Sequence, residues 1–122
     1  MSIWFQNKKH DLEALNQFCA KTAIENCGIK LTAIGEDYLE GTMPVDHRTV
    51  QPFKVLHGGA TALLAESLGS IAANLVIDSS LYRAVGQSIQ THHLLPTLQD
   101  YVIGVASPVH LGRRSHLWRI EI

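Results

Sequence analysis

Residues 51–70 read QPFKVLHGGATALLAESLGS, a polar loop that runs into an apolar segment with a single carboxylate, Glu66. Apolar residues recur at helical spacing along that segment: Leu64, Leu68, Ile71 and Leu75. This periodicity predicts a helix from Ala60 to about Ile77. Glu66 lies off the apolar stripe, among small side chains that would let a ligand or another backbone come close.

The turn His57-Gly58-Gly59 stands where this helix is expected to begin. The first N–H groups of a helix have no acceptor within it, and the helix dipole adds partial positive charge at that end. Glycine allows close approach of the backbone, so the Gly58 N–H is a candidate donor to an oxyanion. A donor of this kind, followed by the carboxylate of Glu66, supplies the parts of an acyl-transfer site.

Composition restricts the class of protein. The chain has 122 residues, is 46% hydrophobic and carries a net charge of -1, which is typical of one globular domain with its own core. Basic residues are scattered apart from Lys8-Lys9 and Arg113-Arg114, so no stripe for nucleic acid is predicted. No apolar run suggests a membrane span, and the N-terminal residues lack a signal-peptide core. Two cysteines, Cys19 and Cys27, are too few for a disulfide framework and indicate the reducing cytoplasm.

The remaining elements are predicted from alternation and turn residues. A short helix capped by Asp11 would turn four side chains inward: Leu12, Leu15, Phe18 and Cys19. Five strands are expected, at residues 29–33, 39–45, 84–94, 101–109 and 116–122. One long helix against an antiparallel sheet defines the α+β class, and we treat residues 1–122 as a single domain.

Several motifs follow one another along the chain: LEALN at 12–16, TMPVDHRTVQPF at 42–53, LHGGA at 56–60, LAESLGS at 64–70, HLGRR at 110–114 and WRIEI at 118–122. In this order the sequence resembles the hotdog-fold acyl-CoA thioesterases of the 4-hydroxybenzoyl-CoA type that use a helix-borne glutamate. The most similar members are small bacterial enzymes that act on aryl-CoA thioesters. They include the 1,4-dihydroxy-2-naphthoyl-CoA thioesterases of menaquinone synthesis and their enterobactin-pathway relatives.

The resemblance implies a hotdog fold, in which a curved antiparallel sheet wraps a central helix. It also implies a homodimer with shared active sites, and a homotetramer built as a dimer of dimers. Relatives continue past the position of Ile122 into one further strand that inserts between two others, and we expect this C-terminal strand to be missing here. No cofactor is implied, because coenzyme A enters as part of the acyl-CoA substrate.

The same resemblance assigns catalytic roles. The Gly58 N–H would bind the thioester carbonyl oxygen, assisted by the Gln51 side chain. Glu66, contributed by the neighbouring subunit, would act either as nucleophile or as general base toward water, and the sequence leaves both open. Ser70 would bind the attacking water or the substrate, and His57 would orient the turn. Each also has a plain structural interpretation: loop amide, turn cap, helix packing or solvated side chain.

Substrate-binding roles follow for other positions. His93 would contact the acyl or aryl group, and the turn Gly112-Arg113-Arg114 would meet the nucleotide phosphates, although two solvated arginines in a hairpin explain that turn equally well. Lys54 stands where relatives often have glycine. His92 and His93 are adjacent and would point to opposite faces of a strand, so we expect no metal site.

Two other functions stay open at this point. One is an acyl-CoA-binding module with the hotdog shape and no turnover. The other is a hotdog dehydratase, which also carries its acid on the helix, but those enzymes lack the order of Gln51 followed by His57-Gly58-Gly59.

Overall fold

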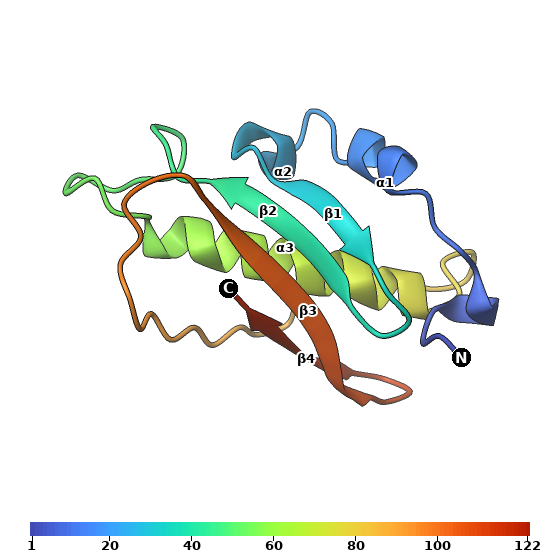
Figure 1. Ribbon diagram of the computed structural model, residues 1–122. Coiled ribbons are helices and arrows are strands. Elements are labelled where there is room, and N and C mark those ends of the chain that lie inside the picture. Colours follow the sequence, from blue (N-terminus) through green and yellow to red (C-terminus); the bar gives the residue numbers. More distant parts are fainter.

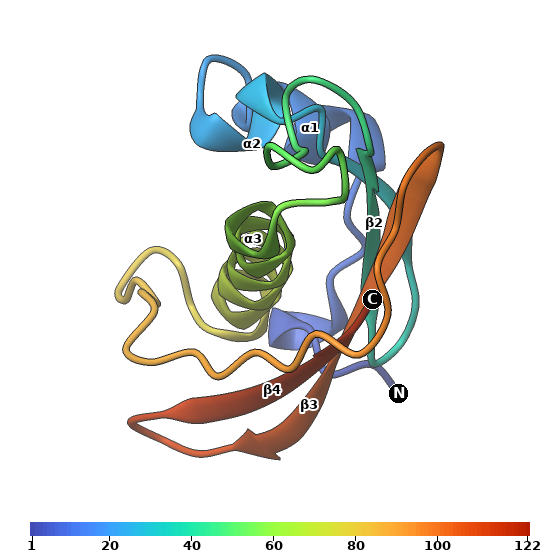
Figure 2. The ribbon, with the colours of Figure 1, turned by 90° about the vertical axis from the view of Figure 1, so that its left-hand side faces the viewer.

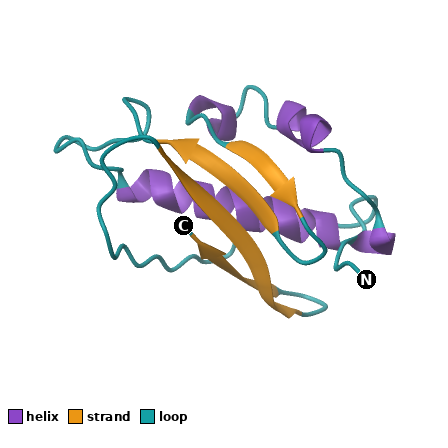
Figure 3. Cartoon of the chain, viewed as in Figure 1, coloured by secondary structure: helices purple, strands orange, loops and turns teal.

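The computed structural model describes all of residues 1–122 and contains one long helix, a four-stranded sheet and short helices near the N-terminus (Figure 1). In chain order the elements are η1 (Phe5–Asn7), α1 (Leu12–Phe18), α2 (Ala23–Asn26), β1 (Lys30–Ile34), β2 (Leu39–Pro44), α3 (Gly58–Val76), β3 (Tyr101–Leu111) and β4 (His116–Glu121). Figure 3 shows the helices and strands as separate layers joined by long loops. The predicted α+β class is confirmed.

The sheet has the order β1-β2-β3-β4, and all neighbours are antiparallel. Seen from the side, it curls around α3, while α1 and α2 lie near the β1 end (Figure 2). This is the wrapped helix that a hotdog fold requires. The expected strands at 29–33, 39–45, 101–109 and 116–122 are found, each with bounds that differ by one or two residues.

The core lies between α3 and the concave face of the sheet. β2 alternates as predicted, with Leu39 and Met43 fully buried. Gly41 and Gly104 pair across β2 and β3, and a Cβ on either would lie 2.8 Å from a methyl group of Leu68. Because neither glycine has a side chain, Leu68 packs directly against the backbone of the sheet and is completely buried.

The helix α3 has the apolar face that the periodicity predicts. Leu64 and Leu68 are fully buried, and Ile71 and Leu75 pack against the same core. By length and composition α3 would also suffice to cross a membrane, which the sequence analysis did not anticipate. Its packing against the sheet identifies it instead as the core helix of a globular domain.

The helix α1 covers the outer edge of β1. Asp11 caps it as predicted, because its side chain accepts from the Glu13 N–H at 3.0 Å. The Asn16 side chain donates to the Leu31 carbonyl (2.9 Å) and accepts from the Leu31 N–H (2.8 Å), so it takes the place of a neighbouring strand. The inward orientation predicted for Phe18 is wrong: this last residue of a two-turn helix is 84% exposed.

The predicted strand at 84–94 is also wrong for the single chain. These residues belong to the α3–β3 connection (residues 77–100), which returns along α3 without regular secondary structure (Figure 1). Residues 83–96 take part in no backbone–backbone hydrogen bond, because no strand of the chain lies beside them. Large apolar side chains are exposed along it: Val85, Ile89, Leu94 and Leu95.

Candidate active site

The N-terminus of α3 presents a free backbone donor. His57 is the N-cap, and its Nδ1 accepts from the Gly59 N–H at 2.8 Å, while its carbonyl accepts from Ala60 and Thr61. An imidazole that accepts at Nδ1 carries its proton on Nε2 when neutral. The Gly58 N–H donates to no acceptor within the chain. The helix therefore begins with one unpaired N–H at the positive end of its dipole.

Gln51 lies in the loop that leads into this helix. An antiparallel bridge between Val50 and Leu56 closes the loop, and the His57 N–H donates to the Thr49 carbonyl at 2.7 Å. The Gln51 side-chain oxygen accepts from the Phe53 N–H, so the amide group is oriented by the loop itself. Its NH2 group has no partner in the chain and is available to a ligand.

Lys54 occupies the tip of this loop with φ of 68°, in the left-handed region. An L residue pays a steric penalty there that glycine does not, which is a physical reason for the glycine that the resemblance expects at this position. The Lys54 side chain is exposed. The departure from the family pattern thus places an exposed cation in the Gln51 loop.

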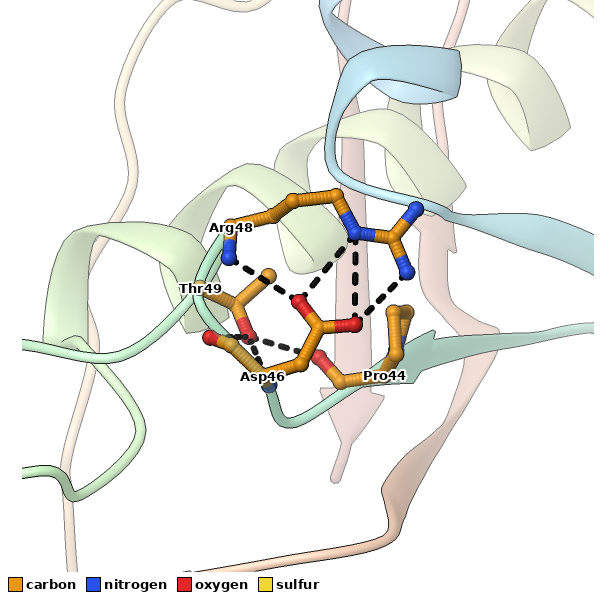
Figure 4. Close-up of polar contacts among 4 residues, drawn as sticks. All are labelled: Pro44, Asp46, Arg48 and Thr49. Carbon is orange, nitrogen blue, oxygen red and sulfur yellow. Dashed lines mark hydrogen bonds and ion pairs between the residues drawn. The ribbon is translucent and has the colours of Figure 1, made fainter.

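The turn before the loop is held by polar contacts (Figure 4). The Arg48 side chain donates hydrogen bonds to the Asp46 carboxylate from Nε and from one terminal nitrogen, the latter at 2.7 Å. The Arg48 backbone N–H donates to the same carboxylate. These bonds lower the pKa of Asp46 to about 2. The Thr49 hydroxyl, which is buried, donates to the Pro44 carbonyl and accepts from the Asp46 N–H. The turn thereby fixes where β2 ends and the Gln51 loop begins.

His93 approaches the helix start from the α3–β3 connection. A Cβ on Gly58 would lie 3.0 Å from His93 Nε2, so the imidazole ring covers the Cα of this glycine. The structure therefore brings His57, Gly58 and His93 together at the junction of loop and helix, with Gln51 in the adjoining loop. A larger residue than glycine at position 58 would have to displace His93.

Glu66 lies further along α3 and is half-buried. Eight residues separate it from Gly58, which corresponds to roughly 12 Å of rise along the helix axis. Within one chain the carboxylate and the free N–H therefore do not reach the same carbonyl group. Ser70, one turn beyond Glu66, is also half-buried, and its hydroxyl makes no hydrogen bond within the chain.

The arginine turn is separate from both groups. Gly112, Arg113 and Arg114 form the tip of the β3–β4 hairpin, where the Gly112 N–H donates to the Ser115 carbonyl at 2.9 Å. Figure 1 shows this tip at the end of the sheet remote from the N-terminus of α3. Both arginines are exposed. A single chain does not bring them to the loop–helix junction, so their role in binding phosphate stays a prediction.

Two residues that the sequence patterns did not single out, Asn74 and Gly86, lie where the α3–β3 connection meets α3. The Asn74 side chain accepts from the Ala84 N–H (2.8 Å) and donates to the Ala84 carbonyl (2.9 Å), which fastens the α3–β3 connection to the helix. Gly86, two residues later, lies against the Glu66 carboxylate. A glycine inside a run predicted to be a strand was the available signal for such a close approach. No group of three or more His, Cys, Asp or Glu side chains is placed to hold a metal ion.

Comparison with known proteins identifies the family. Residues 53–122 match the model of the thioesterase superfamily. The chain is 44% identical over 120 residues to a 1,4-dihydroxy-2-naphthoyl-CoA hydrolase of Escherichia coli, covering 98% of this chain and 86% of that protein. It is 49% identical over 121 residues to a proofreading thioesterase, EntH, of Cronobacter sakazakii, covering 98% and 85%.

Solved structures give the same result. The crystal structure of a thioesterase from Haemophilus influenzae superposes with a TM-score of 0.91 at 45% identity, covering 97% of this chain and 80% of that one. A thioesterase from Pseudomonas aeruginosa gives a TM-score of 0.94 at 42% identity, covering 98% and 84%. The chain belongs to the hotdog thioesterase superfamily. It is a thioester hydrolase.

Proposed function

We propose that this protein hydrolyses acyl-CoA thioesters with an aromatic or medium-chain acyl group to the free acid and coenzyme A. The observation that carries the proposal is the unpaired Gly58 N–H at the start of α3. It would donate to the thioester carbonyl oxygen, where negative charge develops when the carbonyl carbon is attacked. The NH2 group of Gln51 would add a second donor.

Glu66 supplies the attacking chemistry in this proposal. As general base it takes a proton from water, whose oxygen bonds to the carbonyl carbon. The tetrahedral intermediate then collapses and the C–S bond breaks, releasing the coenzyme A thiolate. As nucleophile it bonds to that carbon itself and the C–S bond breaks, releasing the coenzyme A thiolate; water then hydrolyses the resulting anhydride to the free acid and the Glu66 carboxylate. Ser70 would position the water, His57 would orient the turn, and His93 would contact the acyl group.

The separation of Gly58 and Glu66 supports a site shared between two copies of the chain. At roughly 12 Å along one helix they cannot act on one carbonyl, so we assign the donor to one protomer and the carboxylate to its partner. A homodimer follows from this assignment, and the family resemblance extends the proposal to a tetramer formed by two dimers. The exposed apolar side chains of the α3–β3 connection would be covered in such an assembly.

The substrate class rests on the relatives. The Escherichia coli protein is named for 1,4-dihydroxy-2-naphthoyl-CoA, which suggests an aryl-CoA substrate here and a place in menaquinone biosynthesis. We place the reaction in the cytoplasm, with which the free thiols of Cys19 and Cys27 are compatible. Arg113 and Arg114 would bind the phosphates of coenzyme A from the hairpin tip.

A thiol-release assay with benzoyl-CoA and a fatty acyl-CoA tests the reaction. We expect Glu66→Ala to lower turnover by at least about 100-fold, the lower range for a positioned base, while Glu13→Ala on α1 leaves it unchanged. Equal thiol release by wild type and Glu66→Ala would remove the assigned role. Tight binding of the acyl-CoA by the wild-type chain without turnover would indicate a binding module instead.

Mixing two inactive variants tests the shared site. When Glu66→Ala and Gln51→Ala chains are co-expressed in equal amounts, half of the dimers contain one chain of each kind. In such a mixed dimer, one of the two sites contains both native residues and the other contains neither. One site in four is therefore native, so about a quarter of wild-type activity should return. Activity no higher than that of the separate variants would place both groups in one chain's site.

A further inference from the structure

The α3–β3 connection passes over Glu66 at Gly86. A Cβ built on Gly86 would overlap Oε1 of the Glu66 carboxylate and would lie 2.8 Å from its Cδ and 3.3 Å from Oε2. Of the nine glycines in the chain, Gly86 alone has a carboxylate among the nearest atoms that an added Cβ would meet. The carboxylate therefore occupies the space that a side chain at position 86 would take.

The backbone at Gly86 does not itself require glycine. Gly28 is the single glycine of the chain with positive φ, so residue 86 has a conformation that other residues adopt without strain. What glycine contributes at this position is the absence of a Cβ. This differs from Gly41 and Gly104, whose missing side chains make room for the apolar Leu68.

The backbone is also held where it is. Asn74 fixes Ala84, two residues before Gly86, through the pair of hydrogen bonds described above. Glu66, in contrast, ends in a carboxylate beyond three rotatable bonds. When a methyl group is added at position 86, the flexible end of Glu66 should move rather than the clamped backbone.

We propose that Gly86 is a positioning residue: because it has no Cβ, it leaves room for the Glu66 carboxylate in the orientation that the structure gives it, and the Asn74–Ala84 clamp holds the backbone beside that carboxylate. This inference deepens the proposed function and rests on the catalytic role given to Glu66. A displacement of about 1 Å in such a group is enough to lower turnover about 100-fold.

The test is Gly86→Ala in the 122-residue chain, with Gly69→Ala as matched control. Gly69 also lies near Glu66 on α3, but its added Cβ would face Ile120 Cδ1 at 3.5 Å, an ordinary contact. We expect kcat of Gly86→Ala to fall by about 10- to 100-fold with KM within about threefold, and Gly69→Ala to match wild type. A folded Gly86→Ala variant with the kcat of the control overturns the proposal.

A second background separates positioning from general damage. In Glu66→Ala chains the added methyl group has nothing to displace, so Gly86→Ala should lower the residual rate by no further factor. The same loss of rate in both backgrounds would show that Gly86 acts on something other than Glu66.

Carbon-13 NMR of the Glu66 carboxyl group gives a measurement that does not depend on activity. We expect its resonance to shift in Gly86→Ala and to stay in place in Gly69→Ala; an unchanged resonance in both contradicts the contact. If the wild-type chain releases no thiol, the proposed function fails, while this measurement still decides whether Gly86 positions the carboxylate.

Discussion

The two faces of α3 differ in how tightly they are packed within one chain. On the face toward the sheet, Leu64, Leu68 and Ala72 are completely buried by residues of the same chain. On the other side, Glu66 is half-buried beneath a connection in which residues 83–96 make no backbone–backbone hydrogen bond. The helix thus carries stability on one face and the candidate chemistry on the other, so substitutions on the two faces should have separable effects.

The largest effect is expected on the packed side. Leu68→Ala removes a side chain that is 0% exposed and should lower the free energy of unfolding by about 3 kcal/mol, measured by urea denaturation. Leu81→Ala, the same change at a residue 72% exposed, should stay within about 0.5 kcal/mol of wild type. Equal losses would mean that burial of Leu68 between α3 and the sheet does not set the cost of its removal.

A second substitution sharpens this result. Gly104→Ala places a methyl group against Leu68 and should cost about 1–3 kcal/mol in the wild-type chain by overpacking. In the Leu68→Ala background the methyl group enters vacated space, so that cost should largely disappear. The measurement is again urea denaturation, and an identical cost in both backgrounds would rule out the direct contact.

On the open side we expect a local effect. Asn74→Ala breaks both hydrogen bonds to Ala84 and should destabilise the connection by about 1–2 kcal/mol, seen as faster hydrogen exchange of the Ala84 N–H and faster proteolysis within residues 83–96. Asn16→Ala is a matched control, because Asn16 makes the same pair of bonds to Leu31 at the β1 edge. It should leave exchange of the Ala84 N–H and proteolysis within residues 83–96 unchanged; faster exchange and cleavage there in both variants would contradict the clamp.

A smaller, kinetic effect is predicted at the hairpin tip. If Arg113 binds coenzyme A phosphate, Arg113→Ala should raise KM for acyl-CoA several-fold, about 1 kcal/mol, without changing kcat. Arg119→Ala, an exposed arginine within β4, serves as control. Equal reductions of kcat and kcat/KM in Arg113→Ala would indicate damage at the reacting centre instead.

The smallest effect concerns the turn before the Gln51 loop. The bonds from Arg48 lower the folded-state pKa of Asp46 to about 2 from its ordinary 3.8, so its stabilising contribution is complete above about pH 4 and is lost as pH falls toward 2. Asp46→Asn should therefore be slightly less stable than wild type at pH 7, and the difference should vanish near pH 2. Because the two side chains remain 34% and 40% exposed, the effect is screened by solvent. Urea midpoints at both pH values provide the measurement, and a difference that grows on acidification would contradict it.

Local sequence patterns were sufficient to predict the structure where burial and hydrogen bonding depend on residues close in sequence. The alternation through Leu39 and Met43, the cap at Asp11 and the apolar stripe of α3 are all found in the structure. The strand predicted at 84–94 is absent, because alternation shows only that a segment suits a sheet, and a strand also needs a neighbour. The predicted inward orientation of Phe18 was wrong for a related reason, because the last residue of a two-turn helix has no neighbouring element to cover it.

The sequence by itself determined the fold class, the family resemblance, and the free donor that follows from the position of Gly58 at the start of a helix. Tertiary structure alone decided the approach of His93 to Gly58 and the contact of Gly86 with Glu66. These features join segments far apart in the chain, and their geometry depends on how the connection lies over the helix. No periodicity or local propensity encodes that placement, because it arises from packing between elements.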